Sequence, residues 1–124
     1  MSGFTAKTRE LIVTRDDARC KRCGRGVYPG SYSIHHRRAR GMGGSSDPAT
    51  NSAANGVVLC GSGTTGCHGW VEAHRDTSRQ LGFLVYQGHD PATVPVCDYL
   101  SRWLLLGTNG DQTEVPAPKE WSAA

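Results

Sequence analysis

Four cysteines form two pairs whose spacing suits a metal ion. Two residues separate Cys20 from Cys23, and six residues separate Cys60 from Cys67. Two thiol pairs can supply four thiolates to one tetrahedral zinc ion, although two separate redox or free-thiol pairs would show the same spacing. We interpret the four as a structural zinc site, whose binding free energy would contribute to folding. The fifth cysteine, Cys97, has no partner in the pattern and is interpreted as a small buried hydrophobic residue.

Three histidines and one asparagine lie in order between and beside these cysteines. His35 and His36 end a segment with a strand pattern, and neighbouring side chains of a strand point to opposite faces. One imidazole can therefore bind a metal while the other reaches a substrate water. His68 directly follows the last cysteine of the second pair. Taken singly, the histidine pair is more often a surface pair and Asn55 a turn residue, but their joint order favours a shared site.

This order of residues resembles the HNH endonuclease family, the ββα-metal nucleases, and in particular the short HNH proteins of actinobacterial bacteriophages. The match consists of Cys20-x-x-Cys23, Ile34-His35-His36-Arg37-Arg38, Asn55 five residues before Cys60, and Cys67-His68. It covers about residues 9–75. The chain departs from the family in the second cysteine pair, which is usually separated by two residues rather than six.

The resemblance implies a role for each matched residue. His36 would be the general base that activates water, and Asn55 would hold the loop and orient that base. His35 and His68 would hold a catalytic divalent ion. The four cysteines would form a structural zinc site that joins two β-strands and a helix.

A further ligand for the divalent ion is expected on the helix that follows His68. Many family members carry a histidine four residues later, and this chain has Glu72 there. Positions four apart share a helix face, whereas His74, six residues on, points away. We therefore expect Glu72 rather than His74 to complete the site. A carboxylate favours Mg²⁺ or Mn²⁺ as the catalytic ion.

Positive charge is concentrated in the first third of the chain. The whole chain has a net charge of +3. Residues 1–40 contain ten of its 14 Lys and Arg residues but only three of its 11 acidic residues. This asymmetry predicts a polyanion partner, although a solvated helix face would give the same balance. Arg37, Arg38 and Arg40 flank the histidine pair, and we expect them to bind DNA phosphates.

Local patterns predict the elements that position these residues. We expect a helix over 5–18, a strand over 31–36, a loop over 39–52, a strand over 56–59 and a helix over 67–79 that Gly82 ends. Strand-like segments follow at 83–86, 93–97 and 103–106, and Asn109-Gly110 predicts a hairpin turn. The expected fold is α+β: a small zinc-stapled ββα-metal (HNH, His-Me finger) domain with an N-terminal helix and a C-terminal β-hairpin extension.

The composition bounds the rest of the interpretation. Of 124 residues, 37% are hydrophobic, and 16 glycines and six prolines indicate much turn and loop. We expect a nuclease domain over 1–82, a β-rich extension of the same domain over 83–115 and a loose tail over 116–124. No run is long enough to span a membrane and no export signal is visible. We therefore expect a cytoplasmic protein, in the host cell if it is phage-encoded.

Together these features predict a metal-dependent endonuclease that hydrolyses DNA phosphodiester bonds, by a nick or a double-strand cut. A role in phage DNA packaging beside a terminase is the leading biological context. A non-catalytic zinc-ribbon DNA-binding or assembly protein on the same scaffold is the alternative. A colicin-like killing domain fits less well, because the chain has no room for a delivery region.

Overall fold

The computed structural model describes residues 3–28, 30–40 and 47–119. Its elements are α1 (Ala6–Arg15), β1 (Tyr32–His36), η1 (Pro48–Asn51), η2 (Ala53–Asn55), β2 (Gly56–Cys60), α2 (Gly66–Ala73), α3 (Arg75–Gln80), η3 (Pro91–Thr93), β3 (Val96–Cys97), β4 (Trp103–Leu106) and β5 (Gln112–Val115). Two antiparallel sheets, β1-β2 and β3-β4-β5, complete a small mixed α/β fold. None of the helices in these ranges is long and apolar enough to cross a bilayer.

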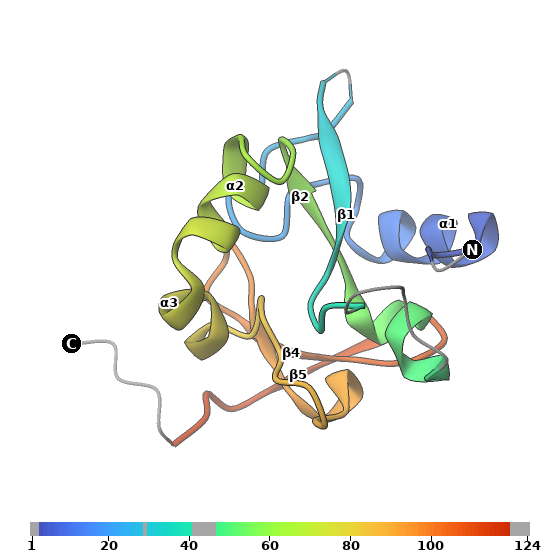
Figure 1. Cartoon of the computed structure of the whole chain (residues 1–124), viewed down its shortest axis with the longest axis vertical. Helices are drawn as coiled ribbons and strands as arrows, with labels where there is room; N and C mark the ends of the chain where they lie inside the picture. Colours follow the sequence, from blue (N-terminus) through green and yellow to red (C-terminus); the bar gives the residue numbers. More distant parts are fainter. Residues whose placement is uncertain (1–2, 29, 41–46, 120–124) are drawn as a thin grey trace.

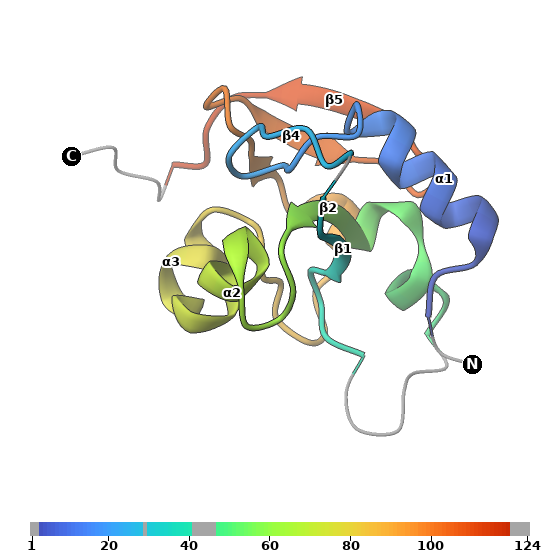
Figure 2. The same ribbon diagram turned by 90° about the horizontal axis from the view of Figure 1, so that it is seen from above.

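The β1-β2 pair lies between α1 and the two helices α2 and α3 (Figure 1, Figure 2). Its register pairs His36 with Gly56 and Tyr32 with Cys60. Because side chains alternate along a strand, Ile34 of β1 packs in the hydrophobic cluster that contains Ile12 of α1. Ser33 and His35, the neighbours of Ile34 in β1, point to the opposite face of the strand, which α2 covers.

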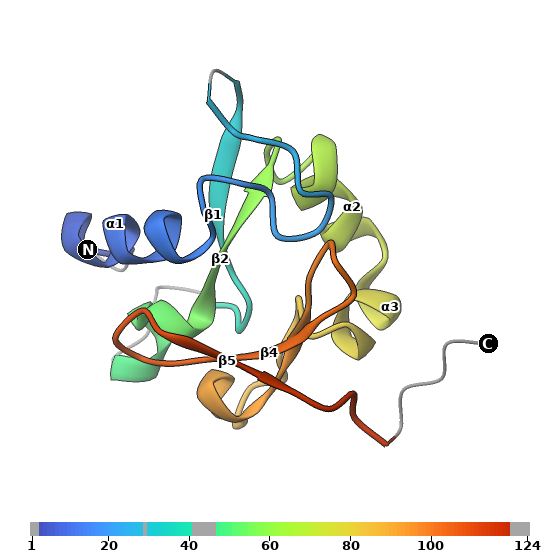
Figure 3. The ribbon, with the colours of Figure 1, turned by 180° about the vertical axis from the view of Figure 1, so that it is seen from behind.

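The second sheet closes the other side of the molecule (Figure 3). Leu104 and Leu106 of β4 belong to the same buried cluster as Val57 and Leu59 of β2 and Val71 of α2. The β4-β5 turn contains the Asn109-Gly110 pair, so the predicted hairpin is present. This shared cluster fixes α2, and with it His68, against the β1-β2 pair.

A buried carboxylate joins the end of α1 to the first cysteine pair. Asp16 accepts from Arg15 at 2.8 Å and from Lys21, which lies between Cys20 and Cys23, at 2.9 Å. It also accepts from the backbone N–H of Val58 at 3.0 Å. Burial alone would raise the pKa of Asp16, but the two cations and the backbone donor together lower it. Asp16 therefore holds the first cysteine pair against β2.

The helix expected over 67–79 is two helices that meet at His74. His74 has φ −119° and ψ 63°, which no α-helix continues. Its backbone N–H and its ring Nδ1 both donate to the carbonyl of Trp70, at 2.9 Å each, and its ring stacks on the indole. The side chain thus caps α2, and the chain turns before α3 begins.

The segment 83–86 is not a strand, contrary to the prediction. The N–H groups of Phe83 and Leu84 donate to the Ser78 carbonyl at the end of α3, and that of Val85 donates to the Arg37 carbonyl. These bonds tie the segment to α3 and to the end of β1 rather than to a sheet. Of the predicted strand 93–97, only Val96–Cys97 pairs with β4. The predicted loop 39–52 lies partly outside the described residues, and its end forms the short helix η1.

Candidate metal centres and active site

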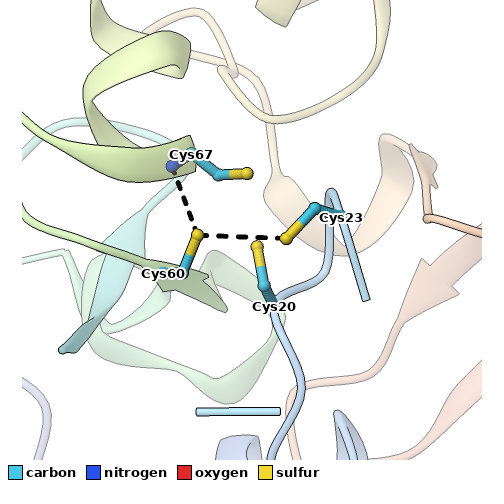
Figure 4. Close-up of side chains that lie close together, drawn as sticks. All are labelled: Cys20, Cys23, Cys60 and Cys67. Carbon is cyan, nitrogen blue, oxygen red and sulfur yellow. Dashed lines mark hydrogen bonds between the residues drawn. The ribbon is translucent and has the colours of Figure 1, made fainter. Parts of the chain in front are cut away.

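The four predicted zinc ligands lie together, which confirms that the two cysteine pairs converge. Their sulfur atoms all lie within 4.8 Å of one another, and Cys23 and Cys60 approach to 3.9 Å (Figure 4). A tetrahedral zinc with bonds of about 2.3 Å needs sulfur atoms about 3.8 Å apart. The four thiols could therefore bind a metal such as zinc. Cys97 is half-buried rather than buried and is not part of this cluster.

The six residues between the second pair of cysteines form a loop that closes on itself. Gly61 and Gly66 both have positive φ, 84° and 61°, and a Cβ on Gly61 would lie 2.8 Å from the Gly66 Cα. Only glycines permit this approach. As a result the Cys67 N–H lies 3.4 Å from the Cys60 sulfur (Figure 4). The longer spacing therefore still brings both thiols to one point.

The protein environment of the thiols differs from one to the next. Burial raises the pKa of Cys67 to about 12, although Arg22 donates to its sulfur at 3.4 Å and opposes this shift. Burial also raises the pKa of Cys20. For Cys60 burial acts in the same direction, but the Cys67 N–H and the neighbouring thiols outweigh it and lower the pKa. Burying such thiols as anions needs a cation among them.

A second cluster contains His35, His68 and Glu72, whose ligand atoms also lie within 4.8 Å of one another. His35 comes from β1, and the other two lie one turn apart on α2. The Nδ1 of His35 is 3.2 Å from the Nε2 of His68. The Glu72 Oε2 lies 3.6 Å and 3.8 Å from these two nitrogens. His74 is absent from this cluster, as predicted, because it stacks on Trp70.

The partner on the far side of the His35 ring decides which of its nitrogens carries the proton, whereas the partner of His68 is a hydroxyl that can donate or accept. The Nε2 of His35 contacts the Phe83 carbonyl at 2.7 Å, and a carbonyl only accepts, so this nitrogen is protonated. The Ser33 hydroxyl lies 2.6 Å from the Nδ1 of His68 and 3.2 Å from the Gly61 carbonyl, and its single proton can go to either acceptor. If Ser33 donates to His68, the Nε2–H of His68 donates to the Nδ1 of His35; if it donates to Gly61, both facing nitrogens present lone pairs to a cation. Burial lowers the pKa of His35 to about 3, so this ring is neutral and its Nδ1 carries a lone pair toward His68.

His36 lies apart from this cluster, on the other face of β1. Its ring stacks on Phe4, with centroids 4.0 Å apart, and its Nε2 lies 2.9 Å from the Asn51 Oδ1. An amide oxygen only accepts, so Nε2 is protonated and Nδ1 carries a lone pair. Burial lowers the pKa of His36, with Arg40 acting in the same direction, and so favours the neutral ring. The pair of adjacent histidines is therefore divided between two faces, as strand alternation predicts.

Asn55 is fully buried and holds the chain around the site rather than touching His36. Its amide group donates to the carbonyls of Arg38 and Thr50, and its Oδ1 accepts from the Arg38 N–H at 2.7 Å. The loop-holding part of its predicted role matches these contacts. The side chain that hydrogen-bonds to His36 is that of Asn51. Nothing in the sequence distinguishes Asn51 from other loop residues, because its contact depends on where η1 packs.

Two of the three arginines predicted to bind phosphate are buried. Arg37 is 0% exposed and donates to four carbonyls: Gly82, Ala54, Pro91 and Val94. Burial lowers its pKa to about 9. Arg38 is 5% exposed and bonds to Asp47, Thr50 and the His89 carbonyl. The phosphate prediction is therefore wrong for both, because their donors are used inside the fold. Arg40 is exposed and stays a predicted phosphate contact.

His36 and Glu72, the latter from the second cluster, line one cleft of about 250 Å³. Its lining includes His36, Glu72, Arg75, Arg79 and Gln87. The Arg75 side chain is half exposed and donates to Glu72 at 2.7 Å. The cleft thus combines a neutral imidazole, the carboxylate of the second cluster and two cations that the sequence interpretation missed. Their signal was weak, since Arg75 and Arg79 lie outside the basic first third.

No protein-family model, no curated protein and no solved structure matches this chain.

Proposed function

We propose that the chain is a metal-dependent endonuclease of the HNH type that hydrolyses DNA phosphodiester bonds. The observation that carries the proposal is the convergence of two imidazole nitrogens and a carboxylate near a separate neutral imidazole, His36. The two facing nitrogens are 3.2 Å apart, and when His68 carries its proton on Nδ1, both lone pairs can bind one cation. The order of strand, strand and helix that supplies these groups supports the same proposal.

The donor set of the second cluster fits a divalent ion. His35 Nδ1, His68 Nε2 and a Glu72 oxygen would hold it, and three protein ligands leave positions for a phosphate oxygen and water. Bound there, a divalent ion such as Mg²⁺ or Mn²⁺ would stabilise charge on the scissile phosphate and on the leaving oxygen. The cysteine cluster would hold zinc as a structural ion.

His36 is placed to act as the general base. Asn51 accepts from its Nε2, which leaves the Nδ1 lone pair to take a proton from water. The resulting hydroxide attacks phosphorus, and the P–O3′ bond breaks to give a 5′-phosphate and a 3′-hydroxyl. The exposed Arg40 and Arg75 would bind neighbouring phosphates. DNA is the expected polyanion, and a role in phage DNA packaging beside a terminase stays part of the proposal.

The test is relaxation of supercoiled plasmid by zinc-loaded protein in buffer free of other divalent ions, with Mg²⁺ or Mn²⁺ added in steps. We expect nicked and linear DNA to form only when the ion is added. Glu72→Ala should need more of the ion, whereas the matched helix variant His74→Ala should behave as wild type. A folded, zinc-loaded protein that binds plasmid but never cuts it would contradict the proposal and favour the non-catalytic DNA-binding alternative.

A further inference from the structure

We propose that a second cleft, beside the one that holds His36, binds an unpaired nucleotide of the strand to be cut. This inference rests on the proposed endonuclease function. The second cleft has a volume of about 620 Å³, within the roughly 300–1,000 Å³ of pockets that enclose small ligands. The two clefts share Arg79 and Tyr86 in their walls. A DNA strand that passes Arg79 and Tyr86 would therefore lie in both clefts.

The shared pair offers a stacking surface at the boundary of the two clefts. Tyr86 is 56% exposed, and the Arg79 guanidinium carbon lies 4.2 Å from its ring centroid. Exposed aromatic rings stack nucleobases without sequence preference, and a nearby arginine adds a cation–π contribution. In a duplex each base is already stacked between its neighbours, so only an unpaired or flipped base can use this ring.

Arg79 is the one cation among the described residues that line the second cleft, and Asp76 is the one anion. The Nη1 of Arg79 lies 3.5 Å from the Asp76 carboxylate, which is fully exposed, so this ion pair is weak. The Arg79 side chain is 25% exposed, and its guanidinium can therefore donate to a phosphate oxygen. The remaining wall is largely apolar, with Trp103, Val94 and Pro95, as a nucleobase requires.

The experiment measures binding without cleavage. Fluorescence anisotropy of labelled dT12 and of a blunt 20-base-pair duplex is recorded with zinc-loaded protein and no other divalent ion. Tyr86→Ala should weaken dT12 binding roughly 5- to 150-fold, the effect of losing one stacked base, and leave duplex binding nearly unchanged. Tyr86→Phe keeps the ring and should stay within about twofold of wild type. Arg79→Ala should lower the salt slope for dT12 by about 0.7.

Tyr28→Ala is the matched control, since Tyr28 is also exposed, at 62%, but lies outside both clefts. It should bind dT12 as wild type does. As an independent readout of stacking, 2-aminopurine placed in the oligonucleotide should be quenched by wild type and not by Tyr86→Ala. Tyr86→Leu, which keeps an apolar side chain, should behave like Tyr86→Ala and serves if the alanine variant does not fold.

Equal dT12 affinity for wild type and Tyr86→Ala would overturn the inference, as would equal losses for Tyr86→Ala and Tyr28→Ala. Loss of binding in Tyr86→Phe would also overturn it, because it would assign the effect to the hydroxyl. The proposed function fails separately. If dT12 binds through Tyr86 but plasmid is never cut, the endonuclease proposal falls and the nucleotide site stands. If plasmid is cut and Tyr86→Ala changes neither assay, only the nucleotide site falls.

Discussion

The cysteine cluster and the histidine–glutamate cluster draw on neighbouring residues of one helix, yet their ligand sets differ. Cys67 and His68 begin α2 and point into different clusters. The first cluster has four ligands of one kind, enough to close a tetrahedral shell. The second has three ligands of two kinds, and its carboxylate is 36% exposed toward a cleft. A closed shell stabilises the fold, whereas an open one leaves room for a substrate.

The comparison also shows what each cluster depends on. The cysteine cluster is assembled by turns, the closed loop after Cys60 and the segment that Asp16 anchors. The histidine cluster is assembled by regular elements, β1 and α2, and the rings of His35 and His68 are held by hydrogen bonds to Phe83 and Ser33. Loss of the cysteine cluster should therefore unfold the chain. Loss of the histidine–glutamate cluster should impair only the proposed DNA cleavage. The predictions below test this division.

Removing one thiolate should have the largest effect. Cys20→Ser should lose zinc and leave the chain largely unfolded, because binding to a structural zinc site supplies about 10–16 kcal/mol. Zinc content and circular dichroism measure this. Cys97→Ser, which changes a cysteine outside the cluster, is the control and should keep both zinc and fold. A folded, zinc-free Cys20→Ser protein of native stability would show that the cluster is not structural.

Mutating the two adjacent histidines should separate the open cluster from the base. His36→Ala should cut DNA roughly 10²- to 10⁴-fold more slowly and keep its affinity for the catalytic ion. His35→Ala should weaken that affinity, so that more Mg²⁺ or Mn²⁺ restores part of the rate. Cleavage rate against ion concentration distinguishes the two. If added Mg²⁺ or Mn²⁺ restores the rate of His36→Ala instead, His36 is the metal ligand and His35 the base. Both variants should keep their zinc and their fold.

Asp16, which holds the first cysteine pair against β2, should contribute to the free energy of unfolding in a way that depends on pH. The lowered pKa of Asp16 means that its contribution is present above its ordinary pKa and is lost as the pH falls through the lowered value. Asp16→Asn leaves Arg15 and Lys21 buried without their partner, at a cost of about 3–5 kcal/mol at pH 7. The difference from wild type should shrink as the pH falls below about 4.

Urea unfolding of wild type and Asp16→Asn between pH 7 and pH 3 measures this difference. Asp76→Asn is the control, because that carboxylate is fully exposed and should leave stability unchanged. A gap between wild type and Asp16→Asn that stays constant down to pH 3 would show that Asp16 is not the titrating anchor.

The smallest effect is expected at Asn51, which touches the base but no metal ligand. Asn51→Ala removes one hydrogen bond to His36 and should slow cleavage about tenfold, equivalent to about 1.4 kcal/mol. Asn51→Asp keeps an acceptor and should retain more of the rate. Single-turnover cleavage measures both, with Ser52→Ala as the control in the same segment. An unchanged rate in Asn51→Ala would show that stacking on Phe4, rather than the Asn51 hydrogen bond, positions the His36 ring.

Local residue types were enough to predict which side chains form the two clusters. Cysteine spacing, strand alternation at His35 and His36, and the helical offset from His68 to Glu72 each depend on a few neighbouring residues. The same holds for β1, which the sequence predicts over 31–36 and which is observed over Tyr32–His36, and for the hairpin at Asn109-Gly110. Strand alternation and helix periodicity follow from backbone geometry that all proteins share, so a few neighbouring residues are enough to apply them.

Tertiary packing decided what those local rules leave open. The sequence predicts Arg37 as a phosphate ligand beside two histidines, yet its guanidinium is 0% exposed because four carbonyls from three other segments surround it. Asn51 reaches His36, and Arg75 and Arg79 reach the cleft, only because η1, α2 and α3 pack where they do. The sequence by itself determined which groups could bind metal and move protons. Which groups face each other, and which face solvent, depended on contacts between residues distant in the chain, and no short pattern encodes those.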